Sequence, residues 1–197
     1  MAENRLNLTA LFLIYGAVCL DLIIGDPKSI PHPVQAMGLL INGLHNLIEK
    51  YFSRNTFQLR LGGLFIVASV LSFSCLSGWC IERLIMNEDH IYKSIGYIII
   101  LISLTSCLAA KSLESRVKEV IYCLQNDNQN NLTNAKEKLR FIVGRNVMDL
   151  DKNGILRAVA ETSCENSVDG IFAPLFWMII GGILWKLSPN LPGPLAM

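Results

Sequence analysis

The sequence is poor in charge, and it lacks the short motifs by which many soluble enzymes are recognised. Charged residues make up only 17% of its 197 residues, and the formal net charge is +1. Because this balance leaves no basic stripe, we expect no nucleic-acid partner. The sequence contains no Walker A phosphate loop, G-x-S-x-G nucleophile turn or H-E-x-x-H zinc motif, which excludes the common forms of those sites. Any nucleotide would therefore need a different kind of binding site.

Paired cysteines are also missing. None of the six cysteines belongs to a C-x-x-C pair, and most lie in apolar segments, where cysteine packs as a small hydrophobic residue. We interpret them as reduced structural residues. The N-terminus has one basic residue before its apolar run and no small-residue cleavage site after it, so that run is interpreted as a retained span.

Long apolar runs are what the sequence does have, since 52% of its residues are hydrophobic. Four runs approach or reach the length that crosses a bilayer, and they cover residues 6–24, 61–81, 95–110 and 171–187. Residues 34–52 show apolar positions at the helical period and one polar face, which is typical of an amphipathic helix. The sequence therefore predicts an all-α, multi-pass helical membrane protein with about four spans, in which 1–197 form a single integral membrane domain.

Lysine and arginine are distributed unevenly among the connecting segments. Of the 17, four lie between the first and second spans and nine between the third and fourth, against two between the second and third and one before the first. Because basic loops tend to stay in the cytoplasm, residues 25–60 and 111–170 are predicted to be cytoplasmic loops. We expect the protein to lie in the cell membrane.

The first of these loops opens with three prolines in the seven residues 27–33. Proline cannot continue a helix, and it biases the preceding residue to extended geometry. Asp26, Lys28 and His32 are therefore held with little freedom and are candidates for a site on a stiff loop; the alternative is a simple helix-ending turn. Asp21, near the end of the first span, is either a functional carboxylate or one that is merely hydrated at the membrane interface.

The second loop ends in a predicted helix that starts near Lys152 and carries several carboxylates. Glu161 and Glu165 lie four residues apart on one face, and Asp169 follows one turn later. Such a stripe could hold Mg²⁺ or a cationic substrate group. The alternative is a solvated face on which Arg157 offsets Glu161.

Shorter helices are predicted earlier in the same loop. They cover residues 111–124 and 132–143, with Thr133 as an N-cap of the second, and Asp151 is expected to cap the acidic helix. Arg145 follows a glycine at a helix end, where it is either a phosphate ligand or a solvent-exposed side chain.

Four separated blocks of this sequence resemble one known family, the adenosylcobinamide-phosphate synthases of cobalamin biosynthesis. In chain order they are Leu20-Asp21-Leu22-Ile23-Ile24-Gly25-Asp26-Pro27, then Pro31-His32-Pro33-Val34, then Ile142-Val143-Gly144-Arg145, and last Glu161-Thr162, Glu165-Asn166, Val168-Asp169-Gly170 and Ala173-Pro174-Leu175-Phe176. The resemblance implies a multi-pass enzyme of the cytoplasmic membrane. Such enzymes use ATP and Mg²⁺ to join an aminopropanol phosphate to the last free carboxylate of adenosylcobyric acid.

That reaction suggests roles for the matching residues and their neighbours. We assign catalysis to Asp26, His32, Glu165 and Asp169, substrate binding to Lys28, Arg145 and Asn166, and metal binding to Glu161, Glu165 and Asp169. The expected partners are a corrinoid, an amino-alcohol phosphate, the lipid bilayer and other enzymes of the corrinoid pathway.

The sequence departs from the family pattern at two positions, since Asn146 and Cys164 stand where the family usually has Asp and Ala. The family also continues past Met197, so the chain is expected to correspond to its N-terminal part. The alternatives to an amide-forming ligase are a non-catalytic membrane scaffold, a small transporter or an inactive truncated remnant.

Overall fold

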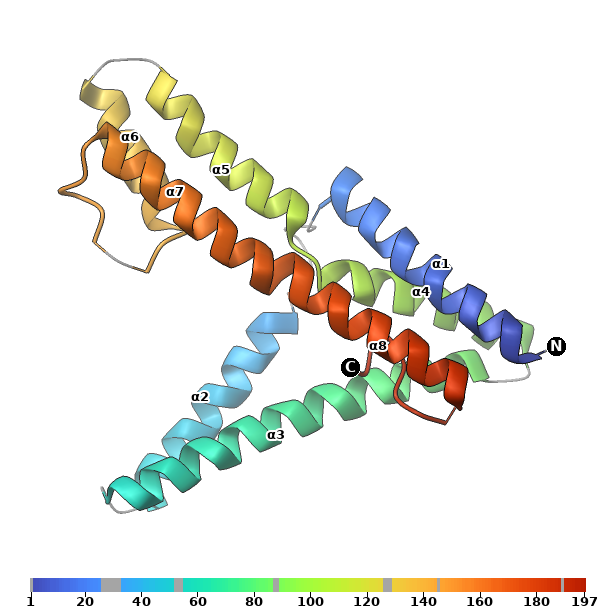
Figure 1. The fold of residues 1–197 in the computed structure, drawn as a ribbon. Helices are drawn as coiled ribbons and strands as arrows, with labels where there is room; N and C mark the ends of the chain where they lie inside the picture. Colours follow the sequence, from blue (N-terminus) through green and yellow to red (C-terminus); the bar gives the residue numbers. More distant parts are fainter. Residues whose placement is uncertain are drawn as a thin grey trace. The chain divides into compact units, whose positions relative to one another are not determined.

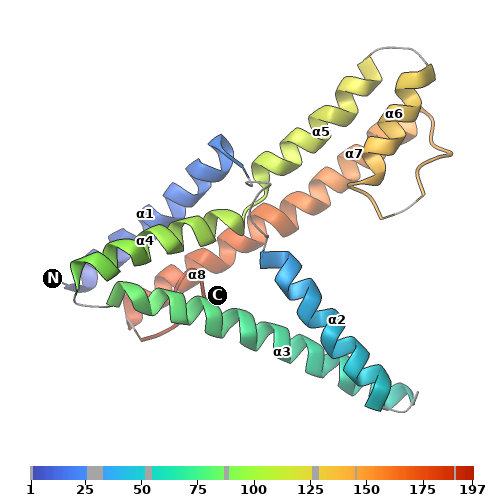
Figure 2. The same cartoon turned by 180° about the vertical axis from the view of Figure 1, so that it is seen from behind.

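The computed structural model describes residues 2–25, 33–51, 55–86, 89–125, 129–144, 146–188 and 190–197. All regular structure in these residues is helical (Figure 1; Figure 2 shows the same elements from behind). In chain order the elements are α1 (Ala2–Ile23), α2 (Pro33–Tyr51), α3 (Thr56–Glu82), the 3₁₀ turn η1 (Arg83–Met86), α4 (His90–Ser106), α5 (Ala110–Gln125), α6 (Gln129–Arg140), α7 (Lys152–Ser167), the π-helical turn η2 (Val168–Phe172) and α8 (Ala173–Leu187).

Several of these helices are long and apolar enough to cross a membrane. Three stretches meet that criterion, Thr56–Ile85, His90–Gln125 and Lys152–Leu187, and Leu8–Ile23 is a shorter apolar helix. Each of the four predicted spans overlaps one of these segments. The fold class is confirmed: the chain is a multi-pass helical membrane protein.

The helices predicted outside the spans are also found, but the one predicted at 132–143 is displaced at both ends, since α6 covers Gln129–Arg140. Helices α2 and α5 match the predicted segments 34–52 and 111–124 within a residue. The N-cap assigned to Thr133 is wrong, because α6 begins at Gln129 and Thr133 lies inside the helix. Helix propensity is a weak prior, and the packing of Leu132 and Leu139 against the core extends the helix through an Asn-rich stretch.

The chain divides into two compact units, each of which is described by itself. The first comprises residues 1–17, 27–106 and 177–197, and the second comprises residues 18–26 and 107–176. The assignment of 1–197 to one membrane domain stays a prediction.

In the first unit, α3 continues through η1 into α4, and α2 packs against α3. The carboxylate of Glu82, at the end of α3, is only 2% exposed. Its Oε2 accepts a hydrogen bond from the Gly193 N–H at 2.7 Å, and its Oε1 accepts from the N–H groups of Leu195 and Ala196 at 2.7 and 3.2 Å. We call residues 190–197, held in this way, the C-terminal clasp.

The neighbouring Arg83 holds the other end of the clasp. Its guanidinium donates to the side-chain and backbone oxygens of Asn190 at 3.0 and 2.9 Å. It also lies 4.3 Å from the centre of the Trp79 ring, a distance at which a cation is attracted to the face of the ring. An acidic and a basic side chain in adjacent positions therefore fix one segment at two points.

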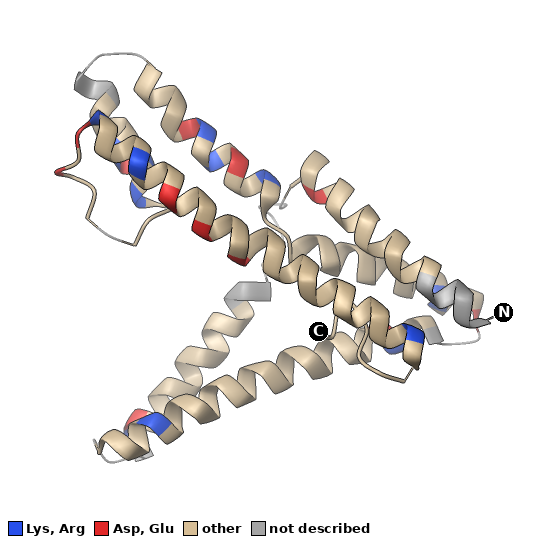
Figure 3. Ribbon diagram, in the orientation of Figure 1, with Lys and Arg blue, Asp and Glu red and all other residues tan. Residues whose placement is uncertain are grey.

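The second unit has its core where α5, α6 and α7 pack together. The buried residues of this core are Val120, Leu124, Ala135, Leu139, Val147, Ile155, Ala158 and Val159. Helix α7 begins where predicted, since Asp151 is its N-cap and accepts a hydrogen bond from the Gly154 N–H at 2.8 Å. Figure 3 shows charged residues along α5 and α7, whereas α3 is uncharged over most of its length.

Candidate functional site

A cavity of about 390 Å³ lies in the second unit, between α7 and the segment that follows α6. Its lining residues are Ile142, Val143, Gly144, Glu161, Thr162, Glu165 and Asn166. These residues come from segments of the chain about twenty positions apart, and they belong to two of the blocks identified in the sequence. The structure therefore brings together three of the predicted site residues, Glu161, Glu165 and Asn166.

The helical period explains which side chains of α7 reach this cavity. Ile155, Ala158, Val159 and Thr162 are buried at the spacing of one helix face. Thr162 is thus the last position of the buried stripe, and it is 8% exposed. Sequence reasoning missed Thr162 as a site residue, although its place on the apolar stripe was the signal that could have identified it.

Asp169, the third carboxylate of the predicted stripe, is exposed on η2 and does not line this cavity. Among the residues that the structure describes, no group of three His, Cys, Asp or Glu side chains could hold a metal ion. The metal role assigned to the three carboxylates stays a prediction.

Four other predicted site residues, Asp26, Lys28, His32 and Arg145, lie outside the described residues. Described residues stand next to Asp26 and Arg145 in the chain. Gly25 ends the first described segment, and Gly144, which lines the cavity, directly precedes Arg145. The roles given to these four residues stay predictions.

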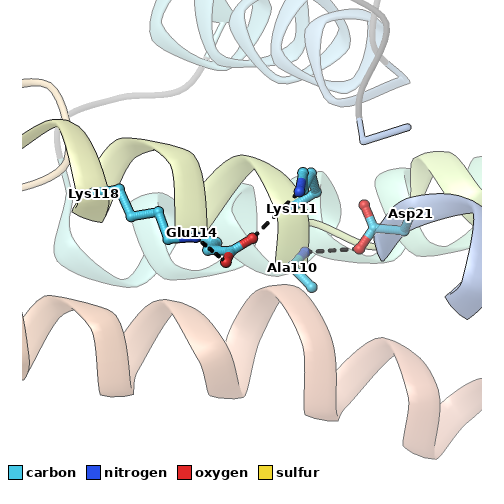
Figure 4. Close-up of polar contacts among 5 residues, drawn as sticks. All are labelled: Asp21, Ala110, Lys111, Glu114 and Lys118. Carbon is cyan, nitrogen blue, oxygen red and sulfur yellow. Dashed lines mark hydrogen bonds and ion pairs between the residues drawn. The ribbon is translucent and has the colours of Figure 1, made fainter. Parts of the chain in front are cut away.

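Asp21 acts as a helix cap in the second unit. Its side chain is buried, with 2% exposure, and its Oδ2 accepts a hydrogen bond from the N–H of Ala110, the first residue of α5, at 2.9 Å (Figure 4). The first N–H groups of a helix have no partner within it, and the helix dipole favours negative charge there. Asp21 therefore satisfies the start of a helix that lies 89 residues further along the chain.

The same helix start is bound from a second side. The N–H of Ala109 donates to the carbonyl oxygen of Gly170 at 3.0 Å. In an α-helix that carbonyl would accept from residue 174, but Pro174 has no N–H to donate. A Cβ on Gly170 would lie 3.2 Å from the Cβ of Ala109, so glycine permits the close approach. Gly170 and Pro174 belong to the same block, and together they free one carbonyl for this contact.

Gly25 also contacts the start of α5, and we call this meeting of the end of α1, the start of α5 and Gly170 the junction. It has φ +70°, a conformation that favours glycine, and its N–H donates to the Asp21 carbonyl at 2.9 Å, as at the end of many helices. A Cβ at this position would lie 2.8 Å from Cγ of Lys111. Gly25 thus fixes where the chain leaves α1, immediately before the proline-rich segment of the sequence.

Helix α5 also carries a charged face, which lines a second, more open cavity of about 810 Å³. Glu114 pairs with Lys118 at 2.6 Å and with Lys111 at 3.6 Å (Figure 4). Lys138 of α6 pairs with Glu119 at 2.9 Å, and the hydrogen bond and charge of Glu119 raise the pKa of Lys138. These lysines are exposed and paired with carboxylates, as on a solvated helix face.

The comparisons with known proteins agree with this arrangement of blocks. The family model described as CobD/Cbib protein matches residues 14–191. The chain belongs to the CobD/Cbib family. The resemblance read from the four blocks is confirmed, and the cavity and the junction are both built from residues within the matched range.

Curated members of the family are similar to this chain over most of its length. The Cobalamin biosynthesis protein CobD of Clostridium tetani is 40% identical over 170 residues, which are 86% of this chain and 51% of the relative. The protein of that name from Pelobacter propionicus is 34% identical over 168 residues, which are 84% of this chain and 48% of the relative. The one from Synechocystis sp. is 35% identical over 194 residues, which are 98% of this chain and 54% of the relative. The chain thus spans about half the length of these relatives. No solved structure matches.

Proposed function

We propose that this chain is part of an enzyme of cobalamin biosynthesis that joins an aminopropanol phosphate to the free carboxylate of adenosylcobyric acid by ATP-dependent amide ligation. The observation that carries the proposal is the cavity on α7, where residues 142–144 meet the side chains of Glu161, Glu165 and Asn166. Membership of the CobD/Cbib family and the names of the curated relatives support the pathway. Because those relatives are about twice as long, the proposal concerns the whole enzyme, and this chain contributes one of its binding cavities.

Amide formation from a carboxylate requires two chemical tasks. The carboxylate oxygen must first be activated, for which an acyl phosphate made from ATP is the expected form, and a neutral amine must then attack the acyl carbon. Since the amine is an ammonium at neutral pH, the site must hold it and accept a proton from it. Asp26 or His32 is proposed as that proton acceptor, and Lys28 and Arg145 are proposed to contact phosphate.

ATP and Mg²⁺ are the proposed co-substrate and ion. Mg²⁺ usually keeps several waters and binds through one or two carboxylates together with substrate phosphates. The cavity offers two carboxylates, Glu161 and Glu165, and the described residues offer no protein cage of three such ligands. We therefore place the ion on the phosphates of ATP, where it would neutralise their charge.

The enzyme is proposed to lie in the cell membrane with residues 25–60 and 111–170 in the cytoplasm. This orientation follows from the basic residues of those loops. It would place the cavity on the side where ATP and a small soluble amino-alcohol phosphate are found.

Complementation tests the proposal. A strain that lacks its own synthase receives either the 197-residue chain or a chimera in which the downstream half of the Clostridium tetani relative continues it. We expect the chimera to restore cobalamin formation. In the form that complements, Glu165→Gln should lower the ligation rate by about tenfold or more, because the amide cannot hold or neutralise a cation.

The matched control is Glu119→Gln on α5, which changes the same chemical group outside the cavity. It should leave ligation unchanged. If the unsubstituted 197-residue chain and the unsubstituted chimera both insert into the membrane and neither restores cobalamin formation, the ligase proposal is contradicted in favour of a scaffold or transporter. If Glu165→Gln retains full turnover, the cavity has no part in the reaction.

A further inference from the structure

We propose that the cavity on α7 binds the primary ammonium group of the amino-alcohol substrate, with Glu165 as its anionic partner and Thr162 and Asn166 as hydrogen-bond partners. This inference rests on the proposed function and goes further, because it says which part of which substrate the cavity holds. It also distinguishes the cavity from a site for a metal ion.

The size of the cavity selects a small ligand. Its volume is about 390 Å³, near the lower end of the roughly 300–1,000 Å³ typical of pockets for drug-sized molecules. A corrinoid macrocycle is too large to enter such a space, whereas a three-carbon amino alcohol fits with room for part of its phosphate. The cavity therefore suits the smaller of the two molecules to be joined.

The charge of the lining selects a cation. Two carboxylates, Glu161 and Glu165, face the cavity, and its described lining contains no lysine, arginine or histidine. Both carboxylates stand on one face of α7, one helical turn apart, so their like charges reinforce one negative potential. An ammonium group brings the opposite charge and three N–H donors in a small volume.

Thr162 points to a ligand independently of the carboxylates. The residue is 92% buried, because its exposed fraction is 8%, and it lines the cavity. Among the described residues its hydroxyl makes no hydrogen bond, unlike Ser163 and Ser167 of the same helix, which donate to carbonyls one turn earlier at 2.6 Å. The hydroxyl is not among the fully buried side-chain atoms that lack a partner, so it is accessible from the cavity, where an N–H donor can bind it.

The remaining walls suit an organic cation better than a hydrated ion. Ile142 and Val143 supply apolar surface, which can contact the carbon chain of an amino alcohol but offers nothing to the water shell of Mg²⁺. On the side of Gly144 the space is open, since a Cβ at that position would meet no atom within 4 Å. The phosphate end of the substrate can leave the cavity there, next to Arg145 in the chain.

Direct binding measurements test this inference without any turnover. The purified 197-residue protein in detergent is titrated by calorimetry with 1-amino-2-propanol, its phosphate ester, neutral 1,2-propanediol and MgCl₂ alone. Both amines should bind and the diol should not. Glu165→Gln should weaken amine binding by about tenfold or more and Thr162→Val by about threefold to tenfold. Glu119→Gln is the matched control and should bind as the wild type does.

Three results would overturn the inference in proteins whose circular dichroism shows the native helix content. Binding of the diol as tightly as the amine would mean that charge is not recognised. Glu165-dependent binding of Mg²⁺ that displaces the amine would make the cavity a metal site. Absence of amine binding would reject the assignment of the cavity, while complementation would still decide the ligase proposal separately.

Discussion

The C-terminal clasp gives the sharpest test of how this fold is held together. Both carboxylate oxygens of Glu82 accept backbone N–H groups, Oε2 from Gly193 and Oε1 from Leu195 and Ala196. In Glu82→Gln the side chain keeps its shape, but one of the two oxygens becomes an NH₂ group. Whichever way the amide turns, at least one backbone N–H then faces a donor in place of an acceptor.

The magnitude follows from the contacts that are lost. A hydrogen bond to a charged group contributes about 1.5–3 kcal/mol, and a buried donor left without a partner adds its own desolvation cost. Glu82 is 2% exposed, so water cannot readily replace the lost acceptor. We expect Glu82→Gln to weaken attachment of the clasp by about 2–4 kcal/mol, a factor of roughly 30 to 1,000 in its equilibrium.

Trp185 reports on this equilibrium. Its ring is 2% exposed, and Gly193 of the clasp packs so closely on it that a Cβ at Gly193 would overlap the indole. The chain has three tryptophans, so 5-fluorotryptophan labelling should give three ¹⁹F resonances, with that of Trp185 assigned from Trp185→Phe. In Glu82→Gln the Trp185 resonance should lose its native shift and broaden.

The control is Glu49→Gln on α2, where the side chain is 66% exposed and lies 3.9 Å from His45 one turn away. It should leave the Trp185 resonance unchanged. If Glu82→Gln also retains the native shift and the wild-type unfolding temperature, the Glu82 hydrogen bonds do not hold the clasp and the reasoning is refuted.

Three further predictions concern the second unit. Asp21→Ala should lower the free energy of unfolding, measured by thermal denaturation in detergent, by about 1–3 kcal/mol, because the half-buried N–H of Ala110 at the start of α5 loses its acceptor. Asp21→Asn keeps an acceptor and should cost less, and equal losses would contradict the capping role. Gly170→Val should speed hydrogen exchange of the Ala109 amide, since even a Cβ would lie 3.2 Å from the Ala109 Cβ, whereas unchanged protection would show that their hydrogen bond tolerates a side chain. Because Glu119 raises the pKa of Lys138, the stability that this ion pair contributes should be complete below the ordinary lysine pKa and lost as pH rises through the raised pKa. Lys138→Met should abolish that pH dependence, and high salt should diminish it. A stability that rises with pH over the same interval would contradict the expected sign.

Features that depend on local sequence were predictable. Asp151 precedes a helical segment in a good N-cap position, and the structure confirms it as the cap of α7. The apolar runs gave the membrane-spanning class, because a bilayer demands long apolar helices whatever their packing. The pair Glu161 and Glu165 was placed on one face of a helix by spacing alone, and both side chains line one cavity.

Features that depend on contacts between residues far apart in the chain could not be predicted from the sequence. Asp21 left two interpretations open, and neither was a cap for α5, because its partner Ala110 lies 89 residues away. The hydrogen bond between the Ala109 N–H and the Gly170 carbonyl could not be predicted either. It depends on the missing N–H of Pro174 and on a close backbone approach, and neither produces a pattern of side chains in the sequence. Thr162 was overlooked because a threonine in a polar stretch draws less attention than the carboxylates on either side of it.

The π-turn η2 has a consequence for how this region tolerates change. The Ala173 N–H donates to the Val168 carbonyl, so this loop of backbone holds one residue more than an ordinary helical turn. One residue corresponds to about 100° of rotation about a helix axis. Deleting a single residue from Val168–Phe172 would leave hydropathy and composition almost untouched, yet it would turn the carboxylates of α7 to a different side of the helix from Pro174. This turn should therefore conserve its length as well as the glycine at position 170.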